Sequence, residues 1–112
     1  MPNPVVFFEI GCKDPASTTE FYSQLFDWDI TATPMGGSID PRGGVQGQIT
    51  SLGHEPHQYT IFYVQVDDVA AAIEQAVGLG GTALVGPIPI PIGTFAWIKD
   101  PGGNTIGLWK PA

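Results

Sequence analysis

The chain has 112 residues, of which 43% are hydrophobic and 13% are charged. This length fits one domain, and a high apolar content with so little charge excludes an intrinsically disordered chain. Eleven acidic residues outnumber four basic ones, which gives a net charge of −7. Because the four cations are scattered singly along the chain, nucleic acid is excluded as a direct partner.

Cys12 is the only cysteine, so no disulfide can form within the chain. Nothing in the sequence indicates an oxidising compartment, and a lone cysteine in a strand-like run is typically a small buried hydrophobic residue. The first residues lack the basic region and apolar run of a signal peptide, and no apolar stretch approaches the roughly 20 residues that span a bilayer. We therefore expect a cytoplasmic protein with no membrane partner.

The first half of the chain predicts a strand followed by a helix. Residues 4–12 are rich in aromatic and β-branched residues, which favour a strand. Asp14-Pro15 is a helix start signal, because Asp accepts from the free amides and Pro has its φ already set. Phe21, Tyr22, Leu25 and Phe26 follow at helical spacing, so they predict the apolar side of a helix that ends at residues 27–29. The later strand candidates are Asp29–Thr33, Ser38–Ile39 and Val45–Leu52.

The second half predicts the same order of elements. Residues 59–66 favour a strand, Asp68 is a candidate N-cap, and Gly80-Gly81 is typical of a helix C-terminus. The tract 86–93 contains three prolines, which lack amide donors, so we expect an extended crossover loop there rather than a central strand. The predicted strands after the helix are Thr82–Val85, Thr94–Lys99 and Thr105–Trp109, with a turn at residues 100–104.

The two halves look like copies of one unit. When Asp14 is superposed on Asp68, the aromatic and aliphatic residues of the two first strands coincide, and Phe7 matches Ile61. Residues 40–44 resemble residues 100–103, and that register places Gly47 opposite Gly107. Matches that occur in the same order in both halves indicate duplication.

The chain resembles the glyoxalase/bleomycin-resistance/extradiol-dioxygenase superfamily, also called the vicinal oxygen chelate superfamily. The resemblance is carried by residues 7–10 leading to Asp14-Pro15, by residues 20–28, and by the closing segment from Trp97 to Trp109. It implies an α+β fold in which two βαβββ modules form a curved mixed sheet, or cup. One domain would span residues 1–112, with module one at about 1–53 and module two at about 58–112. Small members usually dimerise, so the resemblance also implies a homodimer.

The resemblance implies a divalent metal in many members, held by His, Glu or Gln on the first and last strands of each module. In this chain those positions fall on Phe7, Ile61 and Gly107, and near Gly47. Aliphatic, aromatic and glycine residues offer no lone pair to a metal. A shift of one residue would bring in a glutamine on the module-one strand, but one amide does not hold a metal. We therefore expect no metal cofactor.

His54, Glu55 and His57 offer two imidazoles and a carboxylate elsewhere in the chain. Their spacing differs from helical zinc motifs, and Pro56 prevents a regular helix. Two exposed loop histidines are the commoner explanation, and a metal site there is the alternative.

We expect the ligand-binding residues to share the cup face by strand alternation. Glu9 is the candidate catalytic residue on this face, where it could act as a general acid or base, pair with a cationic ligand, or point at solvent. The glycine at 107 predicts a flat opening among aromatic rings, suited to a planar ligand. The alternative is that these residues pack the core or a dimer interface. The candidate ligand-binding residues are Phe7, Glu9, Gln46, Gln48, Tyr59, Ile61, Tyr63, Trp97, Gly107 and Trp109.

These observations favour a metal-free protein that binds a small planar or cationic organic molecule, for example one that sequesters an antibiotic. They leave open whether the protein is an enzyme. The first alternative is a lyase-, isomerase- or dioxygenase-type enzyme of the same superfamily. The second is a degenerate module with a structural or interaction role.

Overall fold

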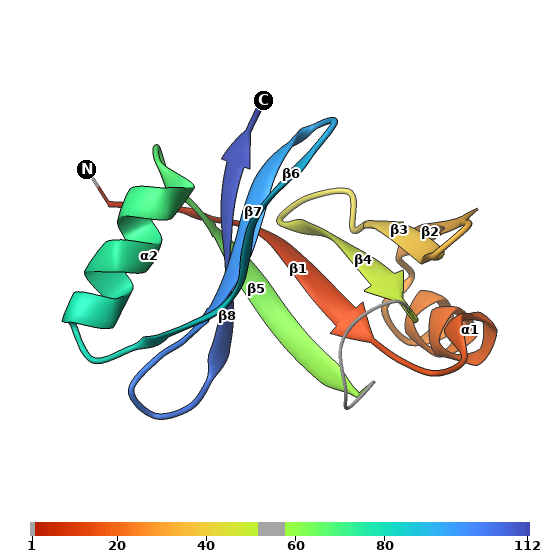
Figure 1. Ribbon diagram of the computed structural model, residues 1–112. Coiled ribbons are helices and arrows are strands. Elements are labelled where there is room, and N and C mark those ends of the chain that lie inside the picture. The colour runs from red at the N-terminus through yellow and green to blue at the C-terminus, as the bar shows by residue number, and fades with distance from the viewer. Residues whose placement is uncertain (1, 52–57) are drawn as a thin grey trace. The chain divides into compact units, whose positions relative to one another are not determined.

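The computed structural model describes residues 2–51 and 58–112 and shows an α+β protein (Figure 1). Two compact units divide the chain: a first unit, Phe7–Ile61, and a second unit, in which Phe62–Ala112 join the N-terminal residues up to Val6. The elements in chain order are β1 (Val5–Gly11), α1 (Pro15–Phe26), β2 (Asp29–Thr33), β3 (Gly36–Asp40), β4 (Gln46–Thr50), β5 (Tyr59–Gln65), α2 (Val69–Gly78), β6 (Thr82–Ile90), β7 (Gly93–Lys99) and β8 (Thr105–Pro111). The order confirms two βαβββ modules, while the predicted cup and homodimer stay predictions.

The strands of the first unit follow the order β2-β3-β4-β1. β1 and β4 are parallel, whereas β3 pairs antiparallel with both β2 and β4, so the sheet is mixed as predicted. Of its predicted strands, β2 has the expected bounds, β3 is longer than the predicted Ser38–Ile39, and β4 is shorter than the predicted Val45–Leu52. Residue 52 lies outside the described part of the chain.

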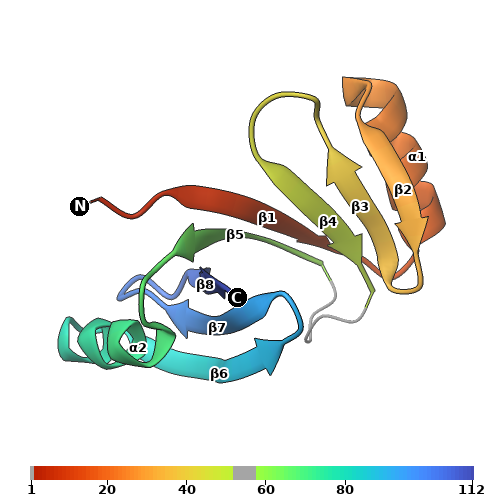
Figure 2. The same ribbon diagram turned by 90° about the horizontal axis from the view of Figure 1, so that it is seen from above.

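α1 begins where the capping signal predicts. The Asp14 side chain accepts a hydrogen bond from the Ala16 amide at 3.2 Å, and Pro15 is the first helical residue. The helix ends at Asp27, which adopts a left-handed conformation. Figure 2 shows α1 beside β2 and β3.

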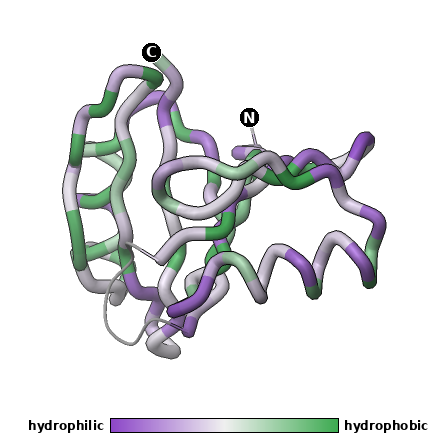
Figure 3. The backbone as a smooth tube through the Cα atoms, turned by 90° about the vertical axis from the view of Figure 1, so that its right-hand side faces the viewer, coloured by the Kyte–Doolittle hydropathy of each residue, from purple (hydrophilic) through white to green (hydrophobic). Residues whose placement is uncertain are grey.

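The predicted apolar side of α1 is right for Tyr22, which packs against the core, and wrong for the other three residues. Phe21, Leu25 and Phe26 are 57%, 58% and 52% exposed, and no residue of α1 is buried. The residues of α1 that are partly shielded are Pro15, Thr18, Thr19, Tyr22 and Ser23. Green and purple segments mix along α1 in Figure 3, which reflects this weakly amphipathic sequence.

The narrow space between α1 and the sheet explains why Phe21, Leu25 and Phe26 are exposed. A Cβ at Gly37 would lie 3.5 Å from the Thr19 hydroxyl oxygen, so the sheet and the helix approach closely there. The core under the helix is formed by Ile10, Cys12, Ile39 and Ile49, and Phe8, Tyr22, Trp28 and Ile30 pack against it. Cys12 is buried, as its strand position predicts. Because large side chains from the sheet fill this space, the helix contributes mainly threonines and a tyrosine.

The strands of the second unit follow the order β5-β8-β7-β6. β5 and β8 are parallel, and β7 is antiparallel to both of its neighbours. The N-terminal residues join this unit at β5, where the Gln65 amide donates to the Pro4 carbonyl at 2.9 Å. The predicted bounds of β5, β7 and β8 are right to within two residues.

The loop predicted for residues 86–93 is wrong. β6 continues through Gly86 and two prolines to Ile90, with irregular register between Ala83 and Ile88. β6 is the last strand in the order, and a proline is tolerated on an edge strand because its missing amide faces away from the ladder. The composition correctly excluded a central strand but did not exclude an edge strand.

α2 has both predicted caps. Asp68 accepts from the Ala71 amide at 3.0 Å. At the other end Gly80 has φ +100°, and the amides of Gly80 and Gly81 donate to the carbonyls of Val77 and Ala76, which is a Schellman motif. The helix buries Val69 against Ala96 and Leu108. Within residues 2–51 and 58–112, neither helix is long and apolar enough to span a bilayer.

Candidate functional site

The register of β4 corrects the predicted equivalence between Gly47 and Gly107. Tyr63 pairs with Gly107 in the second unit, and Glu9, the counterpart of Tyr63, pairs with Gln48 in the first. Gly47 pairs with Phe8, and a Cβ added to it would lie 2.6 Å from the Phe8 ring on the helix side of the sheet. The residue equivalent to Gly107 is therefore Gln48, one position along the chain.

Glu9, Gln48 and Tyr59 come together in the first unit. Glu9 is only 5% exposed, its Oε1 accepts from Gln48 Nε2 at 2.9 Å, and its Oε2 accepts from the Tyr59 hydroxyl. A buried carboxylate requires such hydrogen bonds to offset its lost hydration. Glu9 therefore lies on the same face of the sheet as Gln48, opposite α1, while the predicted role of Glu9 in the cup stays a prediction.

These residues do not fit a divalent metal. The set supplies one carboxylate, one amide and one phenol, and both carboxylate oxygens accept hydrogen bonds from the other two residues. In the second unit the corresponding positions carry Tyr63 and Gly107. Across residues 2–51 and 58–112, no three His, Cys, Asp or Glu side chains gather where they could hold a metal ion. The proposed histidine site at residues 54–57 lies outside the described residues.

Glu9 belongs to a row of polar residues that crosses the first sheet. The strand register aligns Glu9 with Gln48, Gln48 with Ser38, and Ser38 with Thr31. Paired residues on neighbouring strands share a face, so this face, opposite α1, carries a carboxylate, an amide and two hydroxyls. We call these four residues the polar row. Ser38 and Thr31 are exposed and Gln48 is half-buried.

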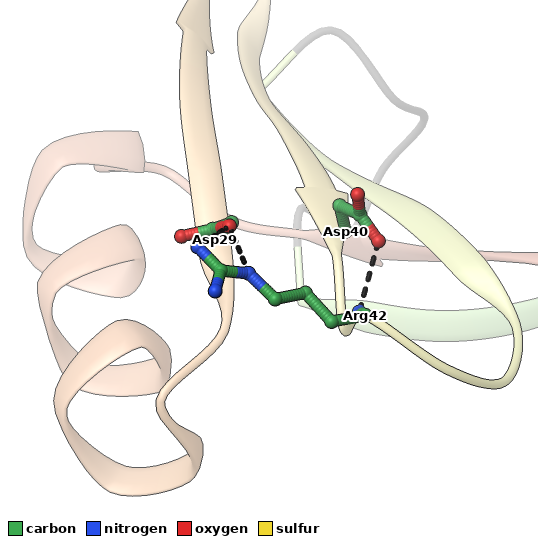
Figure 4. A network of polar contacts seen from close by, with 3 residues as sticks. All are labelled: Asp29, Asp40 and Arg42. Atoms are coloured by element: carbon green, nitrogen blue, oxygen red, sulfur yellow. Dashed lines mark hydrogen bonds and ion pairs between the residues drawn. The ribbon is translucent and has the colours of Figure 1, made fainter.

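An ion pair lies at the end of the same sheet (Figure 4). Arg42 Nε donates to Asp29, and the Arg42 amide donates to Asp40 Oδ1 at 2.9 Å. The hydrogen bond to Asp29 and the charge of that carboxylate raise the pKa of the Arg42 guanidinium above its ordinary value. Both partners are well exposed, so the pair mainly fixes the β3–β4 connection and adds little stability.

The second unit presents an aromatic face on the side of its sheet opposite α2. Tyr63 aligns with Gly107, Gly107 with Trp97, and Trp97 with Val85, while Ile88, Phe95 and Trp109 form the adjacent cross-strand row. α2 packs on the other side against Ala96 and Leu108. We call this set the aromatic face: Tyr63, Val85, Ile88, Phe95, Trp97 and Trp109.

The flat opening predicted at Gly107 does not exist. An ideal Cβ on Gly107 would lie 2.3 Å from Tyr63 Cδ2, so the tyrosine ring already covers the glycine. Trp97 Nε1 donates to the Tyr63 hydroxyl at 2.8 Å and holds the ring in place. Tyr63 and Trp97 are each 6% exposed, so they offer little surface to a ligand.

Trp109 is the more accessible tryptophan of this face. It is half-buried, and its ring lies over Gly93, where an added Cβ would approach Trp109 Cη2 to 2.6 Å. Phe95 pairs with both Trp109 and Ile88, and Ile88 is 37% exposed. A flat ligand would therefore contact the Ile88–Phe95–Trp109 row rather than Gly107.

The remaining predicted site residues, Phe7, Gln46 and Ile61, belong to the first unit. Phe7 is half-buried and aligns with the exposed Gln46, next to the polar row. Ile61 is 4% exposed. The sequence interpretation missed Thr31 and Ser38, although alternation along β2 and β3 could have found them. It missed Ile88 because residues 86–93 read as a loop, and it missed Val85 although that residue ends the predicted strand Thr82–Val85.

The glyoxalase-like domain model matches residues 5–109. Putative glyoxylase CFP32 of Mycobacterium tuberculosis is 29% identical over 91% of this chain and 43% of its own length. A glyoxylase-like domain-containing protein of Didymella fabae is 30% identical over 87% of this chain and 85% of its own. Anthracycline biosynthesis protein DnrV of Streptomyces peucetius is 24% identical over 97% of this chain and 47% of its own, so the chain spans less than half of CFP32 and DnrV.

Solved structures share the fold. A glyoxalase/bleomycin resistance protein/dioxygenase superfamily member from Vibrio splendidus 12B01 has a TM-score of 0.66 at 14% identity, covering 99% of this chain and 100% of that one. Streptomyces coelicolor methylmalonyl-CoA epimerase has a TM-score of 0.73 at 16% identity, covering 100% of this chain and 96% of that one. With the family match over residues 5–109, the chain belongs to the glyoxalase-like domain family, within the vicinal oxygen chelate superfamily.

Proposed function

We propose that this domain binds a small planar organic molecule on the aromatic face, without a metal ion. The observation that carries the proposal is the row of Ile88, Phe95 and Trp109, an apolar strip on the side of the sheet that α2 does not cover. Aromatic stacking contributes about 0.5–1.5 kcal/mol per ring pair, in addition to apolar burial at about 25 cal/mol per Å².

Two further observations support binding without metal. Of the four positions that the resemblance assigns to a metal, Phe7, Ile61 and Gly107 offer no ligand atom and Gln48 offers one amide, while the Tyr63 ring fills the space over the glycine. A relative named for anthracycline biosynthesis also agrees with a role that involves small organic molecules. Glu9, the candidate acid–base residue, belongs to the first unit, whereas the aromatic strip belongs to the second.

Tryptophan fluorescence tests the proposal, because Trp97 and Trp109 are on the aromatic face and Trp28 packs on the helix side of the first unit. We use acridine, uncharged at mildly alkaline pH, and the planar cation proflavine as probes. We expect saturable quenching that survives Trp28→Phe. Trp109→Ala should weaken it about tenfold, since one stacking partner and its apolar area are lost.

Trp28→Phe also serves as the matched control for loss of an indole. Quenching that disappears with Trp28 rather than with Trp109 would place the ligand elsewhere and overturn the proposal. Quenching that grows linearly without saturation would show collisional contact and would overturn it as well. Preference for proflavine over acridine would identify the ligand as cationic.

A further inference from the structure

We infer that the polar row of the first unit is a second binding site, which takes a cationic, hydroxyl-bearing group such as an aminated sugar ring. The polar row belongs to the first unit and the aromatic face to the second. Failure of the aromatic-face proposal would therefore leave this inference intact.

The chemistry of the row follows from its members. Glu9 supplies a carboxyl group, Gln48 supplies an amide that both donates and accepts, and Ser38 and Thr31 supply hydroxyls that do the same. Charge-assisted hydrogen bonds from an ammonium group to a carboxylate are stronger than neutral ones. The carboxylate thus selects the amine, and the amide and hydroxyls select neighbouring hydroxyl groups.

The geometry also fits such a group. Neighbouring strands lie about 4.8 Å apart, so successive members of the row offer polar atoms at intervals comparable to the width of one sugar ring. Glu9 is 5% exposed and is held by Gln48 and Tyr59, whereas Ser38 and Thr31 are exposed. The charged end of the row is therefore fixed in position, and its neutral end is open to an incoming ligand.

The sign of charge around the row favours a cation. Asp40 and Asp29 alternate onto the same face as Ser38 and Thr31, and Arg42 contacts both aspartates. Together with Glu9, these residues place three carboxyl groups and one guanidinium around the polar row. A cation approaching the row meets a negative local field.

Glucosamine is the probe, with glucose as the uncharged hydroxyl-bearing control and cyclohexylamine as the cation without hydroxyls. The side-chain amides of Gln46 and Gln48 report on the site in ¹H–¹⁵N spectra, and the Gln24 amide on α1 is the internal control. We expect saturable shifts at Gln48 with glucosamine, weaker ones with cyclohexylamine, and none with glucose. Absence of saturation with glucosamine, or equal shifts with glucose, would overturn the inference.

Charge-matched variants sharpen the test. Glu9→Gln should weaken glucosamine binding about 10- to 100-fold, as expected for a hydrogen bond to a charged group. Glu20→Gln on α1 removes the same charge at an exposed position and should leave binding unchanged. Equal weakening by both variants would show a general charge effect and refute a site at Glu9.

Ser38→Val keeps the inference testable if Glu9→Gln fails to fold. Ser38 is exposed, and valine favours a strand. We expect glucosamine affinity to fall about 2- to 10-fold, the range for one neutral hydrogen bond, with cyclohexylamine affinity unchanged. No effect on glucosamine would remove Ser38 from the site and contradict the row.

Discussion

Gly107→Ala should destabilise the protein, because the Tyr63 ring occupies the space of the new methyl group. An ideal Cβ on Gly107 would lie 2.3, 2.5 and 2.7 Å from three atoms of that ring. Tyr63 is 6% exposed and accepts a hydrogen bond from Trp97 Nε1 at 2.8 Å. The ring therefore has little freedom to move away.

The magnitude follows from two effects. Overpacking of a filled site costs about 1–3 kcal/mol. If the ring shifts enough to break the bond to Trp97, the free energy of unfolding falls by about 0.5–1.5 kcal/mol more. We expect a total loss of about 1–4.5 kcal/mol, which lowers Tm by at least about 4 °C in a domain of this size.

Urea unfolding and thermal melting measure this loss, with Gly78→Ala as the matched control. Nothing lies within 4 Å of a Cβ added to Gly78, and it ends α2. Alanine there should raise the free energy of unfolding by up to about 1 kcal/mol, because alanine has the higher helix propensity.

A double-mutant cycle identifies the Tyr63 ring as the cause. In a Tyr63→Leu background the methyl group at residue 107 meets a smaller side chain, so Gly107→Ala should cost at least about 1 kcal/mol less than in the wild type. An equal cost in both backgrounds, or a Gly107→Ala protein as stable as the wild type, would refute the reasoning.

Two further predictions concern the turns and caps. Asp100 Oδ1 accepts from the Asn104 amide at 2.9 Å, and hydrogen bonds from Asn104 lower the pKa of the Asp100 carboxyl. A lowered folded-state pKa stabilises the fold above the unfolded pKa of about 3.9, and this contribution is lost as pH falls through the folded value. The Tm advantage of the wild type over Asp100→Asn should thus be present at pH 6 and shrink below about pH 4, and an advantage independent of pH would contradict this. Asp68→Ala removes the side chain that accepts from the Ala71 amide at 3.0 Å and should lower the free energy of unfolding by about 1 kcal/mol in urea. Asp67→Ala removes the same charge without the cap, and an equal loss in both variants would argue against capping.

Local signals in the sequence predicted the helix starts and the module order. Asp14 and Asp68 cap the two helices. This could be predicted because an aspartate cap accepts a hydrogen bond from an amide only two or three residues further along the chain. The same holds for Gly80, whose positive φ closes α2. The sequence also shows that Phe7, Ile61 and Gly107 have no side-chain ligand atom for a metal, because residue identity alone decides whether a lone pair is present.

The candidate site was only partly predictable. Alternation along β1 placed Glu9 and Phe7 on one face, but the partner of Glu9 depended on the register of β4. A difference of one residue exchanges Gly47 for Gln48 and moves every side chain of that strand to the other face. No signal within residues 45–52 fixes that register, because it is set by hydrogen bonds to β1, nearly forty residues away in the chain.

The sequence by itself determined the capped helices, the alternating strands and the duplicated module, because each depends on interactions between near neighbours. Tertiary structure decided the rest. Phe21 and Leu25 of α1 are exposed, and residues 86–90 continue the edge strand β6. The Tyr63 ring lies over Gly107. Each of these outcomes depends on side chains that are distant in the sequence, because in a close-packed interior a given space can hold only one side chain.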